Sequence, residues 1–275
     1  MELPFSLKTT PPPLDSIDLL SQAESGEARE LVSGQLQSPS RRAGLTRMYL
    51  VRSANGTAEY TLSRDSLGTE FVLLARMNDE MNRFHIFHHK PDEPRYDGAS
   101  PDFTLTWSDD KLRWRSALCK SVPCDKCIYR RRNSVIVDEK PDILLITQGM
   151  EKSTVSEQHW FHMSIRGLST EFGNRVVLCK ACQSDSSPTG TLKLPELNLQ
   201  SVLPTISKKG ELSIRFLTSD RKVLPSARNL QVKTLDHRVV LQFLRMDSWR
   251  FFLDFSSPLS PIQAFSIALS THFWI

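Results

Sequence analysis

The chain has 275 residues, of which 39% are hydrophobic and 24% are charged. This composition excludes a fibrous or wholly disordered chain and fits one globular domain, since a single β-barrel domain can run to about 200 to 250 residues. The formal net charge of +4 permits an anionic partner but does not select one.

Residues 1–44 are predicted to form a mostly disordered tail. They contain Pro11-Pro12-Pro13 and many Ser, Gln and Glu residues, a composition that cannot bury much apolar surface. The first residues lack the basic and then apolar order of a secretion signal, and no window reaches the roughly 18 apolar residues of a membrane span. We therefore expect a protein of the cytoplasm or nucleus, with its folded domain at residues 45–275.

From Leu45 onward, short runs of apolar and β-branched residues alternate with turn formers. The first four runs are TRMYLVR, AEYTLSR, EFVLLAR and RFHIFHH, and later ones include DFTLTW, DILLIT, RVVLQFLRM and SWRFFLDF. A spacing of about 12 residues per strand and turn is typical of an antiparallel meander. In the last two runs the apolar side chains alternate with Gln242 and Asp254, which are expected to face solvent. Residues 149–173 fit either one more strand, around Trp160 and Ile165, or a surface insertion.

The end of the chain predicts a helix. Ser260 is a good N-cap, Pro261 suits the first helical position, and the following PIQAFSIALSTHFWI contains no Asp, Glu, Lys or Arg. A helix of about 15 residues is too short to span a bilayer, and a helix without a charged face must be buried. We expect this helix to lie inside the protein.

The amino-acid sequence around this helix resembles that of a known protein family. The run ARNLQVKTLDHRVVLQFLRMDSWRFFLDFSSPLSPIQAFSIALS resembles the C-terminal signature of the tubby-like proteins, in which V-x-Q-F-G-R, F-x-x-D-[YF] and P-L-x-x-x-Q-A-F-x-I-x-L-S follow one another. The upstream run EFVLLARMNDEMNRFHIF is similar to the family's F-L-L-A-x-R-K strand pair. The resemblance implies a mainly β fold, a closed antiparallel 12-stranded β-barrel around a buried C-terminal hydrophobic helix.

Two positions depart from the family pattern. Leu244 replaces the glycine of Q-F-G-R, which adds bulk where backbones pack closely. His272 to Ile275 stand where the family has F-D-S-K-L-A-C-E, so the final turn that locks the helix is expected to be altered or missing.

The resemblance also implies a phosphoinositide site on the barrel exterior, for phosphatidylinositol 4,5-bisphosphate or the anionic inner leaflet of the plasma membrane. The matching positions are Arg83, Arg95 and Arg131, with Arg132 beside the last, while Glu93 replaces a family lysine. Clustered arginines suit phosphates because they donate bidentate, charge-assisted hydrogen bonds. An alternative register places Lys111 and Arg113 on the family's K-L-R, and ordinary solvated cations remain the simpler interpretation.

Four cysteines form two C-x-x-C pairs, Cys124 with Cys127 and Cys179 with Cys182. Two such pairs could complete a four-thiolate structural zinc site, but their separation is far longer than in a compact zinc ribbon, which favours reduced thiols. No other cofactor is expected. His85, His88 and His89 lack an evident carboxylate partner for a metal site.

The chain contains no motif for nucleophilic, nucleotide-dependent or metal-dependent catalysis, so we expect no enzyme activity. The first hypothesis is a phosphoinositide-binding adaptor tethered to the inner face of the plasma membrane, which also recruits a protein partner. The alternative is a divergent protein-interaction module that has lost lipid binding. Nucleic-acid binding through the run from Arg130 to Arg132 is the weakest option, because no aromatic stacking platform accompanies it.

Overall fold

A computed structural model describes residues 45–53, 58–67, 69–88, 101–118, 142–152, 159–168, 196–206, 212–217 and 221–274. The predicted tail at residues 1–44 lies outside the described residues.

The described elements are almost all strands, as the alternating runs predict. They are β1 (Thr46–Arg52), β2 (Glu59–Ser63), β3 (Phe71–Met77), β4 (Arg83–Phe87), β5 (Phe103–Trp107), β6 (Arg113–Leu118), β7 (Asp142–Lys152), β8 (His159–Leu168), β9 (Glu196–Ser201), β10 (Thr205–Ile206), β11 (Leu212–Ser213), β12 (Leu230–Thr234), β13 (Val239–Arg245), β14 (Arg250–Phe255), the helix α5 (Pro261–Ser270) and the 3₁₀ helix η2 (Thr271–Phe273).

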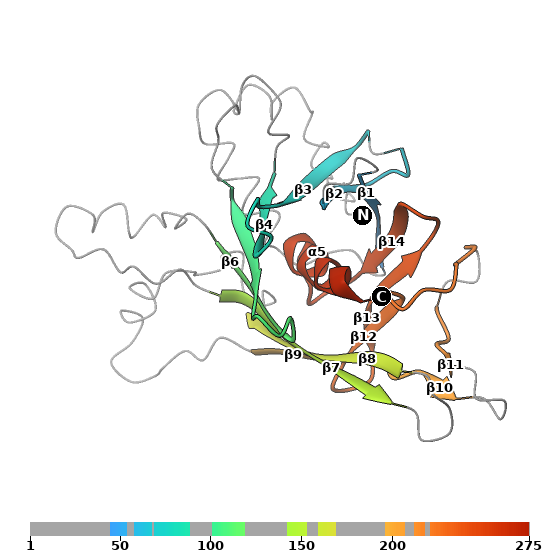
Figure 1. The fold of residues 1–275 in the computed structure, drawn as a ribbon. Helices are drawn as coiled ribbons and strands as arrows, with labels where there is room; N and C mark the ends of the chain where they lie inside the picture. The colour runs from blue at the N-terminus through green and yellow to red at the C-terminus, as the bar shows by residue number, and fades with distance from the viewer. Residues whose placement is uncertain are drawn as a thin grey trace, which may run out of the picture.

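Twelve strands close into one antiparallel barrel. Their order is β1-β14-β13-β12-β9-β8-β7-β6-β5-β4-β3-β2, and β2 pairs with β1 to complete the circle. The short strands β10 and β11 pair with each other outside this sheet. Figure 1 shows the barrel strands surrounding α5. The predicted 12-stranded closed barrel is confirmed, and closure leaves no barrel strand with an unpaired edge.

Within residues 149–173, the strand β8 (His159–Leu168) belongs to the barrel wall. Of the two interpretations of this stretch, the strand is confirmed, since β8 pairs with β7 over nine residue pairs, from Leu144↔Gly167 to Lys152↔His159. Met163 and Ile165 are buried in the core. The alternation of apolar and polar residues in β8 therefore reflects an inward and an outward face.

Helix α5 begins as the sequence predicts. Ser260 is the N-cap, its Oγ accepts a hydrogen bond from the Gln263 backbone N–H, and the Gln263 side chain accepts one from the Ser260 N–H. Together they form a capping box. The helix ends at Ser270, earlier than the predicted 15 or so residues, and continues as a 3₁₀ turn. The Thr271 hydroxyl there donates to the Ala268 carbonyl, which helps to satisfy the carbonyls of the last helical turn.

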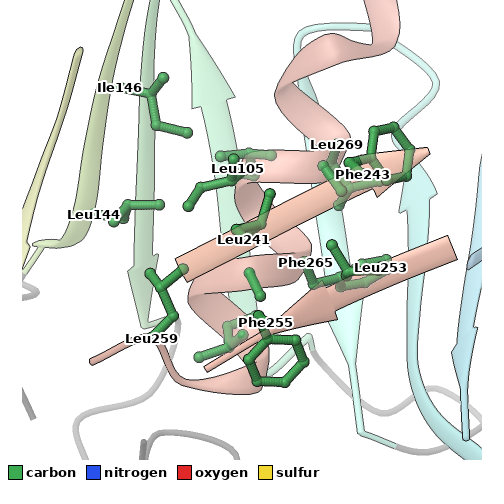
Figure 2. Packing of buried hydrophobic residues seen from close by; sticks show 14 of the residues in the cluster. Leu105, Leu144, Ile146, Leu241, Phe243, Leu253, Phe255, Leu259, Phe265 and Leu269 are labelled. Atoms are coloured by element: carbon green, nitrogen blue, oxygen red, sulfur yellow. The ribbon is translucent and has the colours of Figure 1, made fainter. Parts of the chain in front are cut away.

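The core surrounds this helix on all sides. Ile262 and Phe265 have no exposed surface and Leu269 has 1%. Figure 2 shows Phe265 and Leu269 of the helix among Leu241 and Phe243 of β13, Leu253 and Phe255 of β14, and Leu105, Leu144 and Ile146 from the opposite wall. Even the polar side chains of the helix find partners in the wall, since the Ser266 hydroxyl donates to Ser116 Oγ at 3.0 Å. The expected burial of the uncharged helix is confirmed.

The outward faces of β13 and β14 are also covered, which the alternating pattern did not predict. Gln242 and Asp254 were expected to face solvent, but both have no exposed surface. The connection from β9 to β12 explains this burial, because the backbone N–H of Leu217 donates to Gln242 Oε1 at 2.8 Å. Leu244, which replaces a family glycine, is fully buried on the same face. The added side chain therefore fills space beneath a covering layer.

An ion pair holds this layer to the barrel. Arg221 Nη1 lies 2.9 Å from both carboxylate oxygens of Asp254, and the guanidinium lies 4.3 Å from the centroid of the Phe252 ring. The side chain of Arg221 is 9% exposed and that of Asp254 is 0% exposed. A carboxylate this deeply buried depends on its cationic partner, because water cannot replace the lost interaction.

No helix in the described residues combines the length and apolar character that crossing a membrane requires.

We predict that Arg221→Met lowers the free energy of unfolding by about 3 kcal/mol, because it leaves the Asp254 carboxylate buried without its cation. Urea unfolding followed by tryptophan fluorescence would measure this loss. Arg238→Met, at an exposed position, is the matched control and should change stability by less than about 0.5 kcal/mol. An Arg221→Met protein as stable as this control would contradict the role assigned to the ion pair.

Candidate functional site

Arg83 opens β4 directly after the turn that joins β3 to β4. Asn78 builds this turn, since its Oδ1 accepts from the backbone N–H groups of Asn82 and Arg83 at 3.0 and 3.1 Å. Met81, in the turn, has a φ of 52°. The Nε–H of Arg83 donates to Asn82 Oδ1 at 3.0 Å, which orients the half-buried side chain on the outer wall. A guanidinium has five N–H donors, and this hydrogen bond uses one of them.

The strand register places Arg83 in a row with two further arginines. Arg83 pairs with Thr106, Thr106 with Arg115, Arg115 with Leu145, and Leu145 with Arg166. Residues paired across neighbouring strands share a face of the sheet. Because adjacent strands lie about 4.8 Å apart, successive arginines of this row are about 10 Å apart along the wall of β4 to β8. We call Arg83, Arg115 and Arg166 the arginine row.

The described side chains beside the arginine row are mostly neutral or basic, and the described carboxylates near it lie in the adjoining turns or near the end of β7. Arg115 and Arg166 are exposed, Leu145 between them is 45% exposed, and Arg113 lies two residues before Arg115. Among the side chains that the structure describes on β5 to β9, the one carboxylate is that of Glu151, near the end of β7 and 3.5 Å from His162. Asp109 and Asp110 lie in the turn between β5 and β6. The wall itself therefore presents a positive surface.

The pKa of His85 is influenced by its burial and by the charge of Arg83. Its side chain follows Arg83 on the same face of β4. Burial lowers the pKa of His85 below 6.5, and the nearby charge of Arg83 lowers it further. A histidine that resists protonation beside these arginines adds no further charge to the wall near neutral pH.

The structure describes one of the four residues predicted for the lipid site. Arg83 lies on the barrel exterior as expected, whereas Arg95, Arg131 and Arg132 fall outside the described residues. The alternative register names two residues of the β5–β6 hairpin. Lys111, with a φ of 59°, lies 4.3 Å from the centroid of the Phe273 ring, and Arg113 is exposed at the start of β6.

Sequence reasoning missed Arg115 and Arg166. A local signal existed for Arg115, because Arg113 and Arg115 flank the buried Trp114 with the two-residue period of a strand. Nothing local joins either residue to Arg83, since the row exists only through pairing across five strands.

The metal expectations remain predictions. Cys124, Cys127, Cys179 and Cys182 lie outside the described residues. Within the described part of the chain, no group of three or more His, Cys, Asp or Glu side chains could hold a metal ion. His88 does have a carboxylate partner, contrary to expectation, because its Nδ1 lies 2.6 Å from Asp102 Oδ2. This pair is buried and joins β4 to the residue before β5.

The other polar cluster locks the residues that follow α5. Arg228 Nη2 donates to the His272 carbonyl at 2.8 Å and its Nε to the Trp274 carbonyl at 3.3 Å. Gln148, from β7, donates to the Ser270 carbonyl at 2.9 Å and accepts from Trp274 Nε1 at 3.1 Å. The final turn is altered from the family pattern, but it is not left unlocked. Arg228, just before β12, and Gln148, in β7, hold this turn from two different parts of the barrel.

His272 connects this lock to β2. Its Nδ1 lies 2.6 Å from the Tyr60 hydroxyl. Burial, together with the charges of Arg228, Arg52 and Lys111, lowers the pKa of His272 to about 4. The imidazole is therefore neutral at physiological pH and can pair with the tyrosine.

A closed barrel threaded by its own helix is the fold that the resemblance to tubby-like proteins implied. Comparison with known families agrees, since the family model described as the Tub family matches residues 216–272, from the connection before β12 to the end of α5. Over these residues the chain is similar to the tubby-like proteins. A search of curated proteins found no match.

The low pKa of His272 predicts a loss of stability in mild acid. The unfolded state binds a proton as the pH falls through about 6.5, whereas the folded state resists until about 4. The free energy of unfolding should therefore decrease by about 3 kcal/mol across this window, with the loss complete below pH 4.

Urea unfolding at a series of pH values would measure this loss, with His272→Gln as the reference. The glutamine keeps a polar partner for Tyr60 but does not titrate. A pH profile that is identical for the two proteins would contradict the assignment.

Proposed function

We propose that this protein binds phosphoinositides at the inner leaflet of the plasma membrane and acts there as a non-catalytic adaptor. The observation that supports this function is the arginine row, which continues from the predicted ligand residue Arg83 across the wall to Arg115 and Arg166. The match of the Tub family model to residues 216–272 supports it independently.

The physical case rests on how guanidinium groups meet phosphates. Arginine donates two parallel N–H groups to one phosphate, and it keeps its charge at any physiological pH. Each cation close to an anionic leaflet contributes about 1 kcal/mol, so three of them amount to a binding contribution of about 3 kcal/mol. The exposed Leu145 within the row can approach the headgroup region without a charge of its own to desolvate.

The proposed division of labour leaves other surfaces for a protein partner. Arg95, Arg131 and Arg132 complete the headgroup site in this proposal, and they give selectivity for phosphatidylinositol 4,5-bisphosphate over other anionic lipids. The arginine row supplies affinity for the anionic surface. Residues 1–44 are the proposed segment for recruiting the partner. Nucleic acid is a poorer candidate ligand, because no aromatic side chain takes part in the row to stack on bases.

Vesicle sedimentation tests the proposal. The wild-type chain should sediment with phosphatidylcholine vesicles that contain phosphatidylinositol 4,5-bisphosphate and remain in the supernatant with phosphatidylcholine alone. The triple variant Arg83→Gln, Arg115→Gln, Arg166→Gln should bind about a hundredfold more weakly, because it loses three contributions of about 1 kcal/mol each. Wild-type binding should also weaken as salt is added, since the contacts are ionic.

The control replaces two exposed cations elsewhere, Lys222→Gln and Arg238→Gln, and so removes two positive charges where the triple variant removes three. It should lose far less affinity than the triple variant if position matters. A second variant, Arg95→Gln with Arg131→Gln and Arg132→Gln, should lose the preference for the phosphoinositide over phosphatidylserine. Sedimentation that is indifferent to lipid composition would refute lipid binding and favour the protein-interaction module.

A further inference from the structure

A pocket of about 410 Å³ lies beside the barrel, where the connection between β9 and β12 packs against the ends of the strands. Its walls come from the start of β8, the residues after β9, the residues that follow β11, the approach to β12, and the chain after α5. The lining includes Trp160, Phe161, Phe216, Val223, Ala227 and Trp274.

The lining is aromatic and aliphatic, and no charged side chain belongs to these residues. Four aromatic rings contribute, from Trp160, Phe161, Phe216 and Trp274. The rings of Phe161 and Trp274 are stacked, with centroids 4.8 Å apart and planes 9° apart. Trp274 is itself fixed by its hydrogen bond to Gln148, so one wall of the pocket is rigid. A volume of this size falls within the range of about 300 to 1,000 Å³ of pockets that hold small molecules.

Apart from Trp160, the polar side chains of the lining make hydrogen bonds within the protein. Asn229 donates to the Leu224 carbonyl at 2.8 Å and accepts from the Arg245 backbone N–H at 2.7 Å. The Ser226 hydroxyl accepts from the Arg228 N–H, and Ser213 Oγ lies 3.0 Å from the Thr205 hydroxyl. The indole N–H of Trp160 has no acceptor among the described residues, but it is shielded from solvent.

We propose that this pocket binds a single hydrocarbon chain. A peptide or sugar in the pocket would bury several N–H, C=O or hydroxyl groups, whereas among the lining side chains only the Trp160 indole N–H lacks a partner within the described residues. Each polar group left unsatisfied is costly. A hydrocarbon chain has no polar group to satisfy and gains from the loss of its contact with water. The absence of charge among the lining side chains means that a polar head of the ligand stays outside.

The pocket is distinct from the arginine row. The row crosses β4 to β8 on the outer wall, whereas the pocket is formed at strand ends by β8, β12 and the connection that covers β13 and β14. Its ligand does not depend on the proposed phosphoinositide site. The chain could come from a free fatty acid or from a lipid within a bilayer.

Tryptophan quenching tests the proposal, because Trp160 and Trp274 line the pocket. Stearic acid brominated along its chain, kept below its micelle concentration, should quench the fluorescence of the full chain to saturation at one equivalent. Unlabelled stearic acid should compete with it. Vesicles of phosphatidylcholine brominated on one acyl chain form the second arm, and quenching in that arm alone would identify a membrane lipid as the source.

Two variants are designed to fill the pocket, and a third introduces the same phenylalanine outside the pocket as a control. Ala227→Phe and Val223→Phe place a ring in the space for the ligand and should each weaken binding by about tenfold or more. Ser248→Phe, at an exposed site in the β13–β14 turn, should leave binding unchanged.

Thermal unfolding of each variant shows whether it is folded. If both filling variants are folded and bind as tightly as the wild type, or if neither brominated lipid quenches saturably, the proposal is wrong. The arginine triple variant leaves the lining of this pocket unchanged. Brominated stearic acid should therefore quench its fluorescence as it does that of the wild type, even if the variant no longer binds phosphoinositides. The two proposals can thus fail independently.

Discussion

The structure depends on one constraint, which is that α5 carries no charged side chain and nine of its ten residues are buried. Such a helix is stable in water only if apolar side chains cover it in every direction. A closed barrel provides that cover, because every strand turns its inward side chains toward the same axis. Each barrel strand in turn needs the helix, since without it the space inside would be a cavity.

The polar groups inside the barrel are consequences of this arrangement. Ser266 and Ser116 pair with each other where the helix meets β6, and Gln148 reaches from β7 to the end of the helix. These contacts fix the helix along the barrel axis, which apolar packing alone does less well because it is not directional. Arg228 and His272 close the end where the chain leaves the barrel.

The exterior divides into a covered sector and an open sector. Over β12 to β14 the connection from β9 buries Gln231, Gln242 and Asp254, so the polar letters of the family signature there serve packing and hydrogen bonding. Over β5 to β8 the outward side chains include Arg115 and Arg166, both exposed. Figure 1 shows β12 to β14 and β4 to β8 on different sides of α5. Ligands that need exposed cations can meet them on the open sector, while the pocket proposed for a hydrocarbon chain lies at the border of the covered sector.

Local chemistry in the sequence determined the elements of this protein. The period-two runs predicted the strands, Ser260 and Pro261 predicted the start of the helix, and the missing charges predicted its burial. These signals could be read because propensity, capping and solvation act within a few residues. The family signature joined them into a barrel and placed Arg83 on its exterior.

Tertiary structure decided whatever depends on residues far apart in the chain. The burial of Asp254 required Arg221 to cross over β14, and the arginine row required the register of five strands. The lock on the final turn required Arg228 and Gln148, which lie 44 and 122 residues from their carbonyl partners. Alternation along a strand shows which side chains share a face, but not what covers that face, because a covering segment is chosen by the whole fold and not by its neighbours in sequence.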